Sequence, residues 1–170
     1  MQLTVSNSTI AGNSSQAGGG GLANRSVARG ALRATLVIAD CTIADNANSV
    51  GGTGGGLGAG PRSTSLHDTI LVDNTNASPT GGAPDLAGAP IDAGYNLIGS
   101  VASPTGLSAT DLLNVDPQLG PLQDNGGPTA TMALSPGSPA IDAGNPNGVG
   151  GHGATPKLST QVNSGAYNGI

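Results

Sequence analysis

The sequence predicts an all-β fold, a right-handed parallel β-helix (solenoid), and three observations support this prediction. An eleven-residue segment occurs three times without gaps, at residues 3–13, 36–46 and 64–74. Each aligned column keeps its chemical type, and the third column, for example, holds Val, Ile and Leu. The 170 residues include 30 Gly and 12 Pro but no Glu, Phe or Trp, a composition that disfavours long helices. Repeats at intervals of a few tens of residues are typical of stacked, quasi-one-dimensional folds.

Within each repeat, the spacing of apolar residues predicts two short strands joined by a corner. In the first repeat Val5 and Ile10 are an odd number of residues apart, whereas one face of a continuous strand recurs every second residue. The strand must therefore bend between them. Asn7 lies in this gap, and Asn and Asp tolerate the left-handed backbone of a tight corner better than other non-glycine residues. Two residues of the later repeats align with it, Asp40 and Asp68.

We assign the second corner to Asn13, and we expect the residues between the two corners to alternate between the inside and the outside. Like residues then stack about 4.8 Å apart, which explains why each column tolerates only similar side chains. Parallel crossovers within one sheet are almost always right-handed, and this predicts the hand of the winding. Cys41, the only cysteine, shares an inward column with Ser8 and Thr69. We expect it to be a small buried residue rather than a reactive thiol.

The organisation along the chain predicts one domain over residues 1–145 and a divergent, Gly/Pro-rich, irregular and disordered tail over 146–170. Two glycine tracts, at 18–21 and 51–60, separate the repeats. A phosphate-binding loop would need a Lys and a Ser or Thr in fixed places before a helix, and these are missing. Glycine there permits tight turns and the close approach of stacked backbones.

Charge and hydropathy exclude several classes of partner. The formal net charge is −5 and the sequence pI is about 4.4, so nucleic acid is not expected as a partner. The chain has no apolar run long enough for membrane insertion, and we recognise no signal peptide at its start. We expect His67 and His152 to be surface residues without a functional partner. The arginines are expected on solvated loops, and they are Arg25, Arg29, Arg33 and Arg62.

The second half resembles a known bacterial family. Residues 84–100 read PDLAGAPIDAGYNLIGS and residues 111–144 read DLLNVDPQLGPLQDNGGPTATMALSPGSPAIDAG, and together they are similar to the C-terminal portion of choice-of-anchor Q domain proteins. The repeated segments and the GGGGL tract resemble the upstream coils of that family. The resemblance covers residues 1–145, and its specific part is 115–144. Residues 145–164 depart from the Asp-Gln-Arg-Gly motif with which the family usually continues.

The resemblance implies a right-handed parallel β-helix in a bacterial surface or secreted protein, located at the cell surface or outside the cell. The family carries no catalytic residues, cofactor or metal ligands that can be transferred to this chain. The implied function is that of a non-catalytic structural or adhesive module. Its implied partners are extracellular glycan or a surface protein.

A polysaccharide lyase or hydrolase is the alternative, because pectate-lyase-like enzymes share this fold and fold alone does not decide function. A lyase would need calcium-binding carboxylates beside a basic residue, and a hydrolase would need paired carboxylates. Asp85 and Asp92 flank a short loop beside Tyr95, and we keep these three as candidate sugar-binding residues. The other Asp residues fit turns without basic neighbours, so the sequence favours a non-enzyme. An ice-binding face ranks last, because the threonine column of Thr9 and Thr42 ends in the third repeat.

The first repeat predicts self-association. A solenoid normally covers its terminal coils with a polar cap, because an uncapped coil exposes unpaired backbone groups beside apolar layers. Here the first repeat begins directly with Leu3 and Val5. We therefore expect the chain to stack on another copy of itself through residues 3–13.

Overall fold

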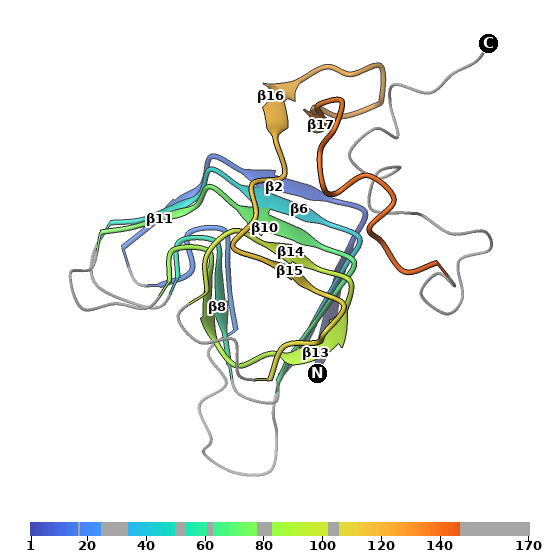
Figure 1. Cartoon of the computed structure of the whole chain (residues 1–170). Coiled ribbons are helices and arrows are strands. Elements are labelled where there is room, and N and C mark those ends of the chain that lie inside the picture. The colour runs from blue at the N-terminus through green and yellow to red at the C-terminus, as the bar shows by residue number, and fades with distance from the viewer. Residues whose placement is uncertain are drawn as a thin grey trace.

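The computed structural model describes residues 1–16, 18–24, 34–49, 54–60, 63–77, 83–101 and 106–146. Within these ranges every regular element is a β-strand, so the all-β prediction is confirmed there. The strands form four parallel sheets and one antiparallel pair. Figure 1 shows that strands of successive repeats lie side by side and that the sheets meet at angles.

Each parallel sheet takes its strands from successive repeats. Sheet 1 consists of β1 (Gln2–Ser6), β5 (Thr35–Ala39), β9 (Thr64–His67) and β13 (Ile91–Gly94). Sheet 2 consists of β2 (Thr9–Ala11), β6 (Thr42–Ala44), β10 (Ile70–Val72), β14 (Leu97–Ile98) and β15 (Leu112–Leu113). Sheet 3 consists of β3 (Ser14–Ser15), β7 (Ala47–Asn48) and β11 (Thr75–Asn76), and sheet 4 of β4 (Leu22–Ala23), β8 (Leu57–Ala59) and β12 (Leu86–Gly88). The antiparallel pair, the β16–β17 hairpin, consists of β16 (Leu119–Gln123) and β17 (Thr131–Leu134).

The pairing register agrees with the alignment of the repeats. In sheet 1, Val5 pairs with Ile38, and Ile38 pairs with Leu66. These side chains belong to one apolar core cluster, in which Ile38 and Leu66 are fully buried. The corresponding row of sheet 2 belongs to the same cluster and runs through five strands, as Ile10, Ile43, Leu71, Ile98 and Leu113. The expected alternation between inside and outside is therefore confirmed for this row.

The first corner has the left-handed backbone that the sequence predicts. The φ angles are 48° at Asn7, 55° at Asp40 and 48° at Asp68. The corner joins the strands of sheet 1 to those of sheet 2. The prediction is confirmed because few residues other than Gly adopt this conformation at low cost, and Asn and Asp are among them.

The second corner lies one residue earlier than predicted. Positive φ falls on Gly12 at 70°, on Asp45 at 56° and on Asp73 at 55°. The assignment of this corner to Asn13 is therefore wrong. Asn is a good corner residue and also a good side-chain hydrogen-bonding residue, and in the Asn13 column its side chain serves the second role, as described below.

Glycine allows the close approach of backbone to this column. A Cβ atom on Gly21 would lie 3.0 Å from Nδ2 of Asn46, and one on Gly56 would lie 2.6 Å from Nδ2 of Asn74. On Gly55 it would collide with the backbone carbonyl oxygen of Thr75. The expectation that these tracts permit close backbone approach is thus confirmed for the glycines that the structure describes.

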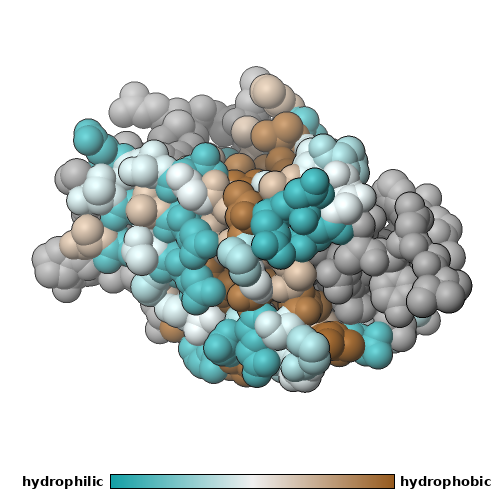
Figure 2. Space-filling model, turned by 90° about the horizontal axis from the view of Figure 1, so that it is seen from above, coloured by the Kyte–Doolittle hydropathy of each residue, from teal (hydrophilic) through white to brown (hydrophobic). Residues whose placement is uncertain are grey.

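A second apolar cluster lies on the outer face of sheet 2 and was not predicted. Ile70 and Leu97 project from this face and are fully buried. Met132 and Leu134 of β17 pack against them, so the β16–β17 hairpin covers the sheet (Figure 1). Figure 2 looks onto this side and shows hydrophobic residues in a band between hydrophilic ones. Sheet 2 therefore has apolar packing on both faces.

Candidate functional site

A ladder of side-chain amides runs along the interior and ends on a carboxylate. Nδ2 of Asn13 donates to Oδ1 of Asn46 at 2.9 Å, and Nδ2 of Asn46 donates to Oδ1 of Asn74 at 2.9 Å. Nδ2 of Asn74 then donates to Oδ1 of Asp85 at 2.8 Å. Each Oδ1 also accepts a backbone N–H from the neighbouring repeat. The ladder satisfies polar groups that are otherwise buried, as a packed interior requires.

A second polar ladder follows the first corner. The backbone N–H of Cys41 donates to Oγ1 of Thr69, and that of Thr69 donates to Oδ1 of Asn96. The N–H of Asn96 donates to Oδ1 of Asp111 at 2.8 Å, so this ladder also ends on a carboxylate. Cys41 is 2% exposed, and burial raises the pKa of its thiol to about 11. The expectation of a small buried cysteine is confirmed.

The three residues that the sequence singles out for sugar binding lie in different networks. Asp85 is 3% exposed and caps the amide ladder. Asp92 of β13 accepts hydrogen bonds from the N–H groups of Gly94 at 3.1 Å and Ser108 at 2.6 Å. Tyr95 has φ 61°, and its N–H donates to Oγ1 of Thr110. Their known contacts are with the fold itself, and none of these contacts joins Asp85 to Asp92 or Tyr95.

Asp92 lies beside Asp111, and both carboxylates accept the N–H of Ser108. Burial, followed by the charge and the hydrogen bond of Asp111, raises the pKa of Asp92 to about 6. Two carboxylates that share one donor disfavour double ionisation. The pair closes the end of the second ladder.

An acidic cavity of about 300 Å³ lies where the second corner meets the chain leading into the hairpin. Three carboxylates line it, those of Asp73, Asp85 and Asp116. Burial raises the pKa of Asp73, and the charges of Asp45 and Asp116 add to this effect. Burial also raises the pKa of Asp85. The cavity therefore favours a proton or a cation over an anionic ligand.

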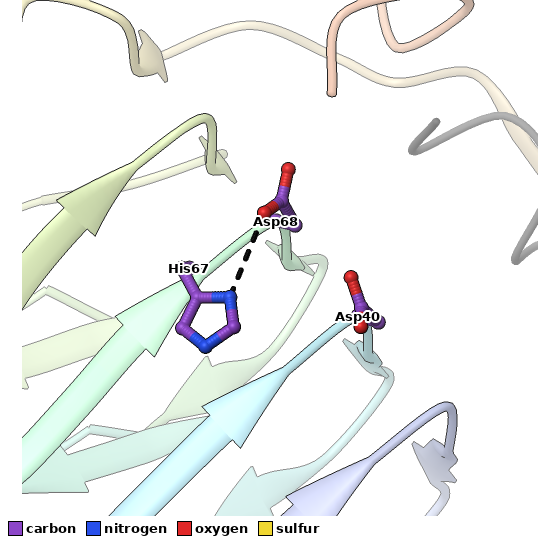
Figure 3. Close-up of side chains that lie close together, drawn as sticks. All are labelled: Asp40, His67 and Asp68. Carbon is purple, nitrogen blue, oxygen red and sulfur yellow. Dashed lines mark ion pairs between the residues drawn. The ribbon is translucent and has the colours of Figure 1, made fainter. Parts of the chain in front are cut away.

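A cluster at the first corner brings together three residues that the sequence analysis did not connect. Asp40 and Asp68 occupy the same corner position in successive repeats, and His67 is the last residue of β9. Their nearest ligand atoms all lie within 4.8 Å of one another. Nδ1 of His67 lies 3.5 Å from Oδ2 of Asp68, and Figure 3 shows this pair with Asp40 on the neighbouring corner. We call these three residues the corner cluster.

The corner cluster is covered by the segment that follows the hairpin. The N–H of Asn145 donates to Oδ1 of Asp68 at 2.7 Å. The side chains of His67 and Asp68 are 14% and 2% exposed, so the expectation of a surface histidine at position 67 is wrong although its outward direction is right. The sequence signal for the cluster was the shared column of Asp40 and Asp68 with a histidine beside it.

A polar cleft of about 240 Å³ adjoins the corner cluster. Asp40 lines it together with Asn7 of the preceding repeat. The other lining residues carry hydroxyl groups apart from one alanine, and they are Ser8, Thr9, Thr42, Thr129, Ala130 and Thr131. The cleft separates the outer face of sheet 2 from the start of β17.

Several residues of the sequence analysis lie outside the ranges that the structure describes. They include the whole tail from 147 onward, His152 and every Lys and Arg of the chain, namely Arg25, Arg29, Arg33, Arg62 and Lys157.

Comparisons with protein-family models, with curated proteins and with solved structures give no match for this chain. The residues that the structure describes contain no helix with the length and apolarity needed to cross a membrane.

Proposed function

We propose that the chain belongs to a right-handed parallel β-helix and serves as a non-catalytic structural or adhesive module of a bacterial surface or secreted protein of the choice-of-anchor Q kind. The observation that carries this proposal is the amide ladder from Asn13 to Asp85, which crosses three repeats. Side chains that stack in register over successive repeats are what a solenoid requires. The proposed partners are extracellular glycan or a surface protein, and the chemistry above identifies neither.

The use of the carboxylates supports a structural role. Asp85, Asp92 and Asp111 all accept hydrogen bonds from backbone N–H groups. A general acid or base must instead face the proton that it transfers on the substrate. These three residues are used to hold the repeats together.

The acidic cavity is the one observation that favours the alternative, a polysaccharide lyase or hydrolase. It places Asp73 and Asp116 beside Asp85 around a space of about 300 Å³. Carboxylates in such a space are the groups with which a glycosidase cleaves its substrate.

Incubation of the purified chain with polygalacturonate and with alginate, each with and without calcium, distinguishes the two proposals. We expect neither unsaturated products nor new reducing ends. The Asp73→Asn and Asp116→Asn variants serve as controls for the cavity. Product formation by the wild-type chain that both variants abolish would establish the enzyme and refute the structural module.

Self-association through the first repeat stays a prediction. β1 is the edge strand of sheet 1, and Leu3 is 55% exposed, whereas its register partner Leu36 is 5% exposed. Exposed edge strands pair readily with other chains. We expect sedimentation velocity to show mass that grows with concentration, and Val5→Lys to reduce this growth. A wild-type chain that stays monomeric at every concentration would contradict the prediction.

A further inference from the structure

The corner cluster combines burial, charge and unsatisfied ligand atoms. Asp40 and Asp68 are 2% and 1% exposed. Oδ1 of Asp68 accepts the N–H of Asn145, but Oδ2 of Asp68 and Nδ1 of His67 are buried and have no hydrogen-bond partner among the described residues. Buried polar atoms are satisfied in the great majority of cases, so these two atoms need an explanation.

The two atoms face each other across 3.5 Å. A carboxylate oxygen is an acceptor, and Nδ1 of a neutral imidazole is an acceptor unless it carries the proton. Two acceptors that face each other without water need a cation between them. A metal ion satisfies both at once.

The separation also fits a shared ion. Ligands bind Zn²⁺ at about 2.0–2.2 Å, so two ligands of a tetrahedral ion lie about 3.4 Å apart. The distance from His67 to Asp68 is 3.5 Å. Asp40 brings a third ligand atom within 4.8 Å of the other two, a separation that a small side-chain adjustment closes.

We propose that Asp40, His67 and Asp68 bind a divalent transition-metal ion, for which Zn²⁺ is the best fit. The imidazole nitrogen selects against Ca²⁺ and Mg²⁺, which prefer oxygen ligands only. The two carboxylates supply the charge that a divalent ion neutralises. Three protein ligands leave a fourth position for water, and Asp40 also borders the polar cleft.

The corner backbone allows clean variants. Asn occupies the same corner position in the first repeat, at Asn7, with φ 48°. Asp68→Asn therefore keeps a residue that this backbone accepts. Asp45→Asn is the matched control, because Asp45 is a corner aspartate with φ 56° that is exposed and outside the cluster.

Isothermal titration of the full chain with Zn²⁺, after removal of metal with a chelator, tests the proposal. We expect one equivalent to bind, and His67→Ala and Asp68→Asn each to weaken binding at least tenfold. Asp45→Asn and His152→Ala, which removes the other histidine of the chain, should bind as the wild type does. With Co²⁺ in place of Zn²⁺, visible d–d absorption should appear in the wild type and be lost in His67→Ala.

Three results would overturn the proposal. They are a wild-type chain that does not bind Zn²⁺, a His67→Ala variant that binds as tightly as the wild type, and binding that His152→Ala abolishes. The measurement on the wild-type chain decides the question even where a variant fails to fold. Equal or tighter binding of Ca²⁺ would overturn the choice of a transition metal.

Discussion

At the scale of single residues, the interior is organised by side chains that bridge neighbouring repeats. Asn46 is the clearest case, because its Nδ2 donates to the carbonyl oxygens of Ile10 and Ala44 as well as to Asn74. Its Oδ1 accepts both the backbone and the side-chain N–H of Asn13. One fully buried amide thus satisfies polar groups of three repeats.

Replacement of Asn46 by Ala should destabilise the chain by about 3 kcal/mol or more, because each buried polar group left unpaired costs about 1–3 kcal/mol. Asn13→Ala is the matched control, since Asn13 belongs to the same ladder but is exposed. We expect it to cost about 1 kcal/mol. Urea denaturation measures both. Equal losses would show that the ladder does not carry the stability assigned to it.

The carboxylates at the ends of the ladders predict a dependence of stability on pH. Burial and Asp111 raise the pKa of Asp92 from 3.8 to about 6, so the folded state holds this proton more tightly than the unfolded state. The stabilisation is complete below about pH 3.8 and is lost as the pH rises through about 6. Burial raises the pKa of Asp73 and Asp85 as well, which adds in the same direction.

The free energy of unfolding should therefore fall as the pH is raised from about 4 to about 7. Asp92→Asn should make this fall shallower, whatever its effect on stability at a single pH. Urea denaturation at a series of pH values measures the slope. A free energy that rises with pH in the wild type would contradict the assigned direction.

At the scale of elements, sheet 2 is distinguished by apolar packing on both faces. Sheets of parallel strands that are buried on both sides are read in sequence as continuous apolar runs, and β10 is such a run, Ile70-Leu71-Val72. Leu71 packs in the interior cluster, whereas Ile70 and Val72 pack beneath the β16–β17 hairpin. The hairpin is therefore an integral part of the packing.

Met132→Ala on β17 should cost about 2–5 kcal/mol, the usual range for such a truncation in a packed core. Met132 is 4% exposed and lies in the outer cluster. Leu122→Ala on β16 is the control, because Leu122 is 47% exposed, and it should change stability by about 0.5 kcal/mol or less. If the two variants lose the same stability, the hairpin does not pack on sheet 2 as described.

At the scale of the whole molecule, the sequence predicted what repeats and missed what occurs once. The parallel register and the left-handed corners at Asn7, Asp40 and Asp68 were predictable, because each is imposed again in every repeat. The hairpin was not predictable, since its few apolar residues stand among prolines and glycines and bury themselves only against sheet 2.

The corner cluster was missed for a related reason. Asp40 and Asp68 are explained as turn residues by their own backbone, so sequence offers no need for a further role. The contact that buries Asp68 comes from Asn145, which is 77 residues away in the chain. Asp85 and Asp92 were singled out correctly as unusual carboxylates, but the contacts that define them, with Asn74 and Ser108, come from other repeats and loops.

The central claim is that successive repeats stack in parallel register, and the backbone hydrogen bonds of sheet 2 test it most directly. The N–H of Thr42 donates to the carbonyl of Ser8, that of Ile70 to Cys41 and that of Leu97 to Thr69, each at 2.9 Å. Nuclear magnetic resonance of the isotopically labelled chain detects such pairs as scalar couplings across the hydrogen bond. We predict a coupling for each of these three pairs. Couplings from the same amides to carbonyls close to them in sequence would show local hairpins instead and would contradict the stacked-repeat fold.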